Sequence, residues 1–301
     1  MYSEIDQVHL HFGQDNVWLL NICLGIIMFG VALELRLSHF RDLLRAPKSA
    51  LVAWASQLLL VPLLTLALLY VLHPVPSVAL GMILVVCCPS GSVSNFLSLT
   101  ARGNAALAVS LSTTFALFAP LTLPLMFSFW VSGYAPAATL SKTVSVGAVD
   151  MFRTVFLLLG LPLALGMTLS ARLPQFAVRL SKPLRWISLL ILLAFIGVSL
   201  VGNWQHFVPH APFLVGIVAL HNALALLGGY LFAQLFSLPE PDARTICLES
   251  GIHNTGLSLA LVFSFFDGLG GMAMIAAWWG IWDMISGMAL AHFWAKKTPA
   301  A

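Results

Sequence analysis

A single glutamate inside an apolar stretch is the residue of this sequence that most needs a chemical explanation. Glu249 lies in Cys247-Leu-Glu-Ser-Gly-Ile-His-Asn-Thr-Gly256, an otherwise apolar segment with two glycines. An ionised side chain in hydrocarbon costs about 3 kcal/mol on insertion scales, so such residues mark the paths of substrates or ions. We therefore expect Glu249 to be functional.

A second segment of similar design lies earlier in the chain. It is Cys88-Pro-Ser-Gly-Ser-Val-Ser-Asn95, and its Ser90-Gly91 aligns without a gap with Ser250-Gly251. Proline removes a backbone donor and glycine tolerates unusual torsions, so a helix is expected to break in each segment. Two interrupted helices in matching halves are typical of the binding site of a secondary transporter. For the first segment taken alone, a kinked packing helix stays open.

Further polar side chains supply oxygen atoms. Gln57 is the only amide in a long apolar run, so it must face the protein interior, either as a link between helices or as an ion ligand. Together with Glu249, the oxygens of Gln57, Ser94, Asn95 and Ser112 would suit Na⁺, a hard cation that takes oxygen ligands. Ser112 is chosen among its neighbouring hydroxyls on the resemblance given below.

Two histidines and a second acid also lie in apolar segments. His253 belongs to the second motif, and a role in proton transfer stays open because imidazole titrates near neutrality. His221 precedes Asn222, and a lone histidine inside a membrane is more often a hydrogen-bonded interior residue. Asp283 is expected to pair within the core, with a histidine as one option. No nucleophile–base pair or metal spacing supports an enzyme or a haem protein, so we expect neither an enzyme nor a cofactor.

The composition identifies the class of protein in which these residues must act. Of 301 residues, 60% are hydrophobic and 8% are charged, and the mean hydropathy is +0.96, whereas about a quarter of the residues of soluble domains are charged. The sequence therefore predicts an all-α polytopic membrane protein. All four cysteines lie in apolar runs, which indicates neither a disulfide framework nor a zinc site. The basic residues lie between apolar runs, so no nucleic-acid partner is expected.

Nine apolar segments are candidates for membrane spans. We expect them at about 17–37, 49–72, 78–100, 104–131, 151–171, 185–203, 211–236, 243–265 and 270–294. The basic stretch 172–184 is predicted as a separate surface helix.

Charge and span number together indicate how the chain lies in the bilayer. With the N-terminus outside, twelve of the 14 Lys and Arg residues fall at cytoplasmic ends, as the positive-inside rule favours, and the C-terminus is cytoplasmic. The second motif is in the eighth span, the fourth helix of a five-helix unit. The first motif is in the third span, so the first unit lacks its opening helix. Five helices to a unit make the two repeats inverted.

With these two motifs the sequence resembles the bile acid:sodium symporter family. The resembling pieces are Leu24-Gly-Ile-Ile-Met-Phe-Gly-Val-Ala-Leu-Glu-Leu35, Cys87-Cys-Pro-Ser-Gly-Ser-Val-Ser-Asn95 with Ala101-Arg-Gly-Asn104, Glu249-Ser-Gly-Ile-His-Asn254 and Ile285-Ser-Gly287. The resemblance implies a bacterial, nine-span member that lacks the first helix of a ten-helix plan. Residues 1–301 would form one transporter domain, with a panel (about 17–37 and 151–203) and a core (about 49–131 and 211–294). In the core two broken helices cross.

The resemblance also implies a function, a location and a site. The function is sodium-coupled symport of an organic anion, bile-acid-like or a small carboxylate such as pantoate, by alternating access in a bacterial inner membrane, with the protein a monomer. One Na⁺ would bind Ser94, Asn95, Ser112 and Glu249. The other would bind Gln57, Glu249, the carbonyls of Ser250 and Ile252, and His253. The anion would contact Ser92, Val93, Asn254 and Thr255.

The sequence departs from the family pattern at two positions. The family usually has a glutamine where this chain has His253, and often a hydroxyl where it has Ala108. A neutral imidazole is a poor sodium ligand, and alanine offers none. A proton-coupled or uncoupled organic-anion transporter with degraded sodium sites is therefore the alternative.

Overall fold

The structure is a computed structural model that describes residues 6, 14–33, 43, 45–143, 148–202 and 204–297. Over these residues the regular secondary structure is helical, in agreement with the predicted all-α class. In chain order the elements are α1 (Gln14–Ala32), α3 (Pro47–Ala55), η2 (Ser56–Leu60), α4 (Val61–Leu72), α5 (Pro76–Cys87), α6 (Ser92–Thr100), α7 (Ala105–Ser132), α8 (Ala135–Thr143), α9 (Ala148–Val155), η3 (Phe156–Gly160), α10 (Leu161–Arg172), α11 (Pro174–Gly202), α12 (Trp204–Leu235), α13 (Glu240–Gly251), α14 (Thr255–Phe265) and α15 (Gly270–Ala295).

Six helical stretches in the described part of the chain are long and apolar enough to cross a membrane. They are Pro47–Leu72, Ala105–Ser132, Val149–Arg172, Val208–Leu235, Glu240–Phe265 and Gly270–Ala295, and each coincides with a predicted span. Shorter apolar helices, Asn21–Ala32 and Pro76–Cys87, lie in the first and third predicted spans. The chain is a polytopic membrane protein, while the total of nine spans and the inverted repeat stay predictions.

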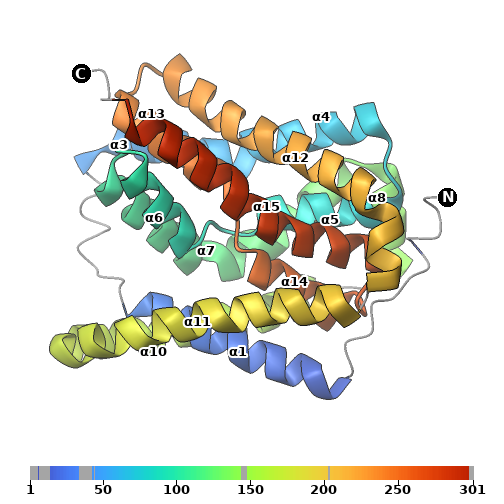
Figure 1. The fold of residues 1–301 in the computed structure, drawn as a ribbon, viewed down its shortest axis with the longest axis horizontal. Coiled ribbons are helices and arrows are strands. Elements are labelled where there is room, and N and C mark those ends of the chain that lie inside the picture. Colours follow the sequence, from blue (N-terminus) through green and yellow to red (C-terminus); the bar gives the residue numbers. More distant parts are fainter. Residues whose placement is uncertain are drawn as a thin grey trace.

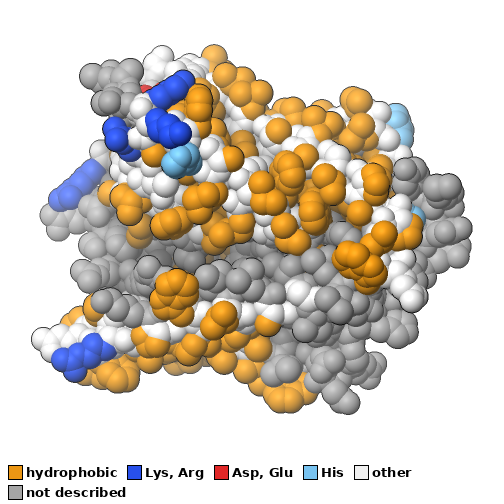
Figure 2. Space-filling view, viewed as in Figure 1, with side chains coloured by type: hydrophobic (Ala, Val, Ile, Leu, Met, Phe, Trp, Pro, Cys, Tyr) orange, Lys and Arg blue, Asp and Glu red, His pale blue; other side chains and the backbone are white. Residues whose placement is uncertain are grey.

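The surface of the molecule is apolar over most of its length. Figure 2 shows hydrophobic side chains across the described face, with Lys and Arg side chains near one end of it. Large side chains such as Leu51, Leu125 and Leu235 are exposed. An apolar patch of this extent would be a liability in water and is the normal exterior of a protein in lipid.

The basic stretch 172–184 is helical, as predicted, but it is not a separate helix. Arg172 ends α10, and from Pro174 the stretch forms the first turns of α11, which runs without interruption to Gly202. Proline fits the first turn of a helix because the donor that it lacks has no partner there. Pro183 lies inside the helix, where one lost hydrogen bond does not stop a long membrane helix.

Two helices are interrupted where the sequence predicts it. The first break, residues 88–91, separates α5 from α6, with extended backbone at Cys88 and Gly91. The second break, residues 252–254, separates α13 from α14, with extended backbone at Ile252. Pro89 explains the end of α5, because a residue before proline is pushed out of the helical region.

The glycines of the two motifs do not have the role that we predicted, and a different role is shown for Gly251. Among the described residues, the only glycine with a positive φ is Gly268, so neither Gly91 nor Gly251 uses the torsional freedom of glycine. Gly251 is the last residue of α13, and a Cβ there would collide with the side chain of Leu226 on α12. Close helix packing therefore requires this glycine.

A π-helical turn, η2, places Gln57 in the helix that packs beside the first break. The turn ends at Leu60. The N–H of the next residue, Val61, donates to the carbonyl of Ser56, and Pro62 follows. Proline lacks a donor and its ring crowds the carbonyl four residues earlier, so the wider turn relieves the strain.

The helices form two groups. In Figure 1, α1, α10 and α11 pack on one another along the lower side, while α12, α13 and α15 lie on the upper side. Of the helices at the two breaks, α5, α13 and α14 are mostly buried, whereas α6 exposes Phe96 and Leu99. Of the most apolar part of Glu240–Phe265, 94% is buried, compared with 28% for Val149–Arg172. Of the second break, Ile252 and His253 are therefore enclosed by protein, whereas Asn254 is partly exposed.

Candidate ion and substrate site

The two breaks touch each other. The backbone N–H of Asn254 donates to the carbonyl of Pro89 over 2.9 Å. The hydroxyl of Ser258, on the first turns of α14, contacts the Cys88 sulfur at 3.1 Å. Segments that lie far apart in the sequence thus satisfy each other's freed backbone groups.

Glu249 is bound to the first break from the last turn of α13. The hydroxyl of Ser90 donates to its Oε2 atom. Its Oε1 atom is buried and makes no hydrogen bond with any described residue, and the side chain is 1% exposed. A buried carboxylate oxygen without a donor is costly unless a cation occupies the space beside it.

Gln57 uses its two side-chain atoms differently. Its Nε2 donates to the carbonyls of Val86 at 3.1 Å and Cys88 at 3.4 Å, at the C-terminal end of α5. This network assigns the amide orientation, and it leaves Oε1 buried without a donor among the described residues. The nitrogen therefore links helices, which is one of the two roles that the sequence left open, and the role of Gln57 as an ion ligand stays a prediction.

Ser250 lies on the same side of the second break as Glu249. Its hydroxyl shares a 2.7 Å hydrogen bond with Ser56 of η2. The π turn therefore contacts both breaks, one through Ser56 and the other through Gln57.

Ser94, Asn95 and Ser112 form a second group, on α6 and α7. The hydroxyl of Ser112 donates to Oδ1 of Asn95 over 3.0 Å. The hydroxyl of Ser94 donates to the carbonyl of Gly91 over 2.7 Å, at the end of the first break. Ala108, one turn before Ser112 on α7, is fully buried. Its methyl group supplies no oxygen to this group.

The imidazole of His253 is buried and takes no hydrogen bond from or to a described residue. Its ring packs edge-on against Trp279, with centroids 5.7 Å apart. Asp283 pairs with His253 as the sequence suggested, but through the backbone: the His253 N–H donates to Oδ2 of Asp283 over 3.0 Å.

Asn222 is a polar residue of this region that the sequence analysis did not select. Its Nδ2 donates to the carbonyl of Gly251 at 2.9 Å and to Oδ1 of Asp283 at 3.1 Å. Asn222 is an amide within a long apolar run, which is the signal that identified Gln57, so the same criterion could have found it.

His221 has interior partners, as a structural histidine should. Its Nε2 lies 2.7 Å from the Thr65 hydroxyl, which itself donates to the carbonyl of Val61. Its ring packs edge-on against Trp279 at 4.7 Å. These contacts favour the structural role for His221.

The predicted anion contacts lie at the starts of the two half-helices. Ser92 begins α6, whose N-cap is Gly91 and so offers no capping side chain, and Val93 is half-buried beside it. Thr255 begins α14, and Asn254 caps that helix by accepting from the Leu257 N–H at 3.0 Å. The Nδ2 of Asn254 lies 3.8 Å from the Met28 sulfur of α1. An uncapped helix start is a suitable site for an anion.

Comparison with known proteins identifies the family. The model of the sodium bile acid symporter family matches residues 21–209. The uncharacterized sodium-dependent transporter YocS of Bacillus subtilis is 30% identical over 92% of this chain and 83% of its own length. The chain belongs to the sodium bile acid symporter family. The resemblance seen in the sequence is thereby confirmed.

Other relatives in this family come from eukaryotes. The probable chloroplastic sodium/metabolite cotransporter BASS2 of rice (Oryza sativa) is 28% identical over 93% of this chain. The human sodium/bile acid cotransporter 4 is 30% identical over 81% of it. The chain spans 64% and 56% of the lengths of these two proteins. Members of the sodium bile acid symporter family are membrane transporters, not enzymes, and family membership supports sodium-coupled transport here.

Proposed function

We propose that this protein is a sodium-coupled symporter that carries an organic anion by alternating access. One observation carries the proposal: Glu249 and Gln57 each keep a buried oxygen without a donor, beside two helix breaks that touch. A carboxylate and an amide oxygen in a dry interior are ligands for a small hard cation. The names of the relatives, which refer to sodium, favour Na⁺ as that cation.

Two sodium sites are proposed, with Glu249 common to both. The first comprises Ser94, Asn95, Ser112 and Glu249. The second comprises Gln57, Glu249, the carbonyls of Ser250 and Ile252, and His253. Support comes from the hydrogen bonds that join Ser112 to Asn95 and Ser90 to Glu249.

The anion is proposed to bind where the half-helices begin, at Ser92, Val93, Asn254 and Thr255. The N-terminus of a helix carries partial positive charge and free N–H groups, which favour a carboxylate. The substrate class is an organic acid, either bile-acid-like or a small carboxylate such as pantoate. The contact between Asn254 and Met28 supports a position of this site beside α1.

Alternating access is proposed to move a core (about 49–131 and 211–294) against a panel (about 17–37 and 151–203). The mutual packing of α1, α10 and α11 supports a separate panel. The N-terminus is proposed to lie outside the inner membrane of a bacterium and the C-terminus in the cytoplasm. The Lys and Arg side chains near one end of the molecule in Figure 2 support this orientation.

Uptake into proteoliposomes tests the proposal. A set of labelled organic acids, including pantoate and a bile acid, is added outside the vesicles with an inward Na⁺ gradient or with K⁺ alone. We expect at least one acid to accumulate only with Na⁺. Accumulation that is equal in both salts would exclude sodium coupling.

The alternative is proton-coupled or uncoupled transport, and His253 is the residue that favours it. Its imidazole lies at a position proposed for a sodium ligand and has no hydrogen-bond partner among the described residues. Replacing His253 with Gln supplies an amide oxygen in a similar volume. If Na⁺ dependence of uptake appears only in the variant, the native protein uses another coupling; if both proteins depend on Na⁺, the alternative is wrong.

A further inference from the structure

The backbone of the second break is bound from two neighbouring helices. Asn222 of α12 donates to the carbonyl of Gly251 at 2.9 Å and to Oδ1 of Asp283 at 3.1 Å. Asp283 of α15 accepts the His253 N–H at 3.0 Å with its other oxygen. The three bonds connect the residues before and after Ile252, and all the side chains involved are buried.

Because of peptide geometry, these hydrogen bonds determine the direction in which the Ile252 carbonyl points. A trans peptide group is planar, and its N–H and C=O point to opposite sides; no cis peptide bond occurs among the described residues. Because Asp283 binds the His253 N–H, the Ile252 carbonyl of that same peptide must point away from Asp283. The preceding peptide is fixed as well, since the Ile252 N–H donates to the Leu248 carbonyl at 3.0 Å.

The side chain of Ile252 is confined by α15 too. A Cβ added to Gly287, one turn after Asp283, would lie 3.0 Å from Cδ1 of Ile252. Helix α15 therefore contacts both the side chain of Ile252 and, through Asp283, the peptide that follows it. Beyond the Ile252 N–H, which completes the last turn of α13, the conformation of the unwound segment depends on contacts with its neighbours.

We propose that Asp283 and Asn222 are a positioning pair that sets the direction of the Ile252 carbonyl, and with it the geometry of the second sodium site. Both carboxyl oxygens of Asp283 accept hydrogen bonds, Oδ1 from the Asn222 amide and Oδ2 from the His253 N–H, so one side chain fixes two groups of the same region. This explains an acid inside the membrane that is not itself a proposed ligand. The consequence for sodium rests on the proposed function, whereas the control of the backbone does not.

Two measurements on the purified full-length protein test the pair. Hydrogen exchange, followed by mass spectrometry on peptides that contain residues 250–256, is measured in KCl. The melting temperature is measured as NaCl replaces KCl at constant ionic strength, which gives the half-saturating Na⁺ concentration. The variants are Asp283→Ala, Asp283→Asn and Asn222→Ala. The matched control is Ser286→Ala, one turn further along α15, because Ser286 bonds only the Trp282 carbonyl of its own helix, at 2.9 Å.

In Asp283→Ala both hydrogen bonds to Asp283 are lost. We expect faster exchange at the second break and a half-saturating Na⁺ concentration raised about five- to a hundredfold, the factor for a buried N–H left without an acceptor. Asp283→Asn keeps one acceptor and should lie between Asp283→Ala and the native protein. Asn222→Ala should also speed exchange, and Ser286→Ala should change neither quantity.

A general structural role gives a different result. A lower melting temperature in KCl, with unchanged exchange at residues 250–256 and unchanged half-saturation, would overturn the proposal. If Asp283→Ala does not fold, Asp283→Asn and Asn222→Ala decide the matter. If the native protein does not respond to NaCl at all, sodium coupling is wrong, and the exchange result alone then supports or overturns the positioning pair.

Discussion

Single side chains beside the two touching breaks use their polar atoms in two different ways. Gln57 donates from its nitrogen to α5 and keeps its oxygen without a donor, and Glu249 accepts from Ser90 with one oxygen only. Each buried polar atom without a partner costs about 1–3 kcal/mol. A bound cation would offset that cost, which gives the ion a direct role in the stability of the broken helices.

Replacing Glu249 with Gln should show how much of its role depends on its negative charge and how much on the size and shape of the side chain. The amide keeps an acceptor for Ser90 but removes the negative charge that a cation needs. We expect a melting temperature in KCl at or above that of the native protein, because an uncompensated buried charge is lost. The rise on replacing KCl with NaCl should disappear, and Na⁺-dependent uptake with it. A native-like rise in NaCl would show that Glu249 is not a ligand.

At the scale of elements, the geometry of the site depends on the distance between helices as well as on the two breaks. Gly229 of α12 lies against α13: a Cβ there would come within 2.7 Å of Cβ and Oγ of Ser250 and 3.1 Å of the Ile246 carbonyl. These are backbone or short-side-chain atoms that cannot turn aside. The glycine therefore lets α12 approach the residue that follows Glu249.

Gly229→Ala should push α12 and α13 apart and displace Ser250. We expect a loss of about 1–3 kcal/mol in stability, typical of overpacking, together with weaker sodium binding. Gly216→Ala is the matched control on the same helix, because its Cβ would meet no heavy atom within 4 Å. The control should be neutral or more stable by about 0.5–1 kcal/mol. Thermal melts of both variants in KCl and NaCl provide the comparison, and equal melting temperatures would contradict the packing argument.

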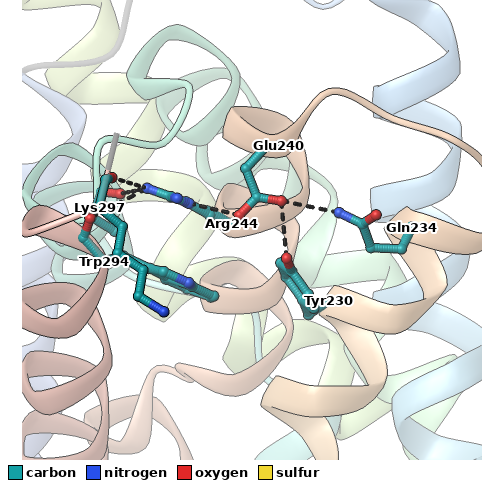
Figure 3. A network of polar contacts seen from close by, with 7 residues as sticks. Tyr230, Gln234, Glu240, Arg244, Trp294 and Lys297 are labelled. Carbon is teal, nitrogen blue, oxygen red and sulfur yellow. Dashed lines mark hydrogen bonds and ion pairs between the residues drawn. The ribbon is translucent and has the colours of Figure 1, made fainter. Parts of the chain in front are cut away.

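At the scale of the whole molecule, Arg244 joins the ends of three helices (Figure 3). It pairs with Glu240 at 2.9 Å and donates to the carbonyls of Ala101, Trp294 and Lys297 at 3.0, 3.4 and 3.3 Å. These carbonyls lie just past α6 and at the end of α15, where cations stabilise a helix. The two broken helices are thus joined at their outer ends as well as at their breaks.

Arg244→Lys should loosen this end of the molecule, because one ammonium cannot reproduce a guanidinium that serves several acceptors. We expect a loss of about 1–3 kcal/mol in stability, the cost of leaving buried carbonyl acceptors without a donor, and a lower maximal rate of uptake. Gln234→Ala is the control, since Gln234 is exposed and bonds Glu240 at the rim of the same network. The melting temperature and the uptake rate are compared for both variants; similar values would contradict the role given to Arg244.

Local features of the sequence were sufficient to predict the class of protein and the positions of the two helix breaks. Apolar length identified the membrane spans that the structure describes, and Pro89 and the polar residues around it marked the end of α5. The prediction that 172–184 forms a separate helix was wrong, because a charge pattern does not show whether a helix continues past a proline. The residues of the two sodium sites and of the anion site remain predictions.

The sequence by itself determined that Glu249 and Gln57 are polar groups in an apolar setting and therefore need partners. The tertiary structure alone decided which of their atoms have partners and which do not. The structure also shows that Asp283 binds the backbone of the second break. Arg244, which the sequence analysis counted only among the basic residues that indicate orientation, joins the ends of three helices. The reason is physical: hydrogen-bond pairing between residues far apart in the chain depends on how the helices pack, and local patterns carry no record of that packing.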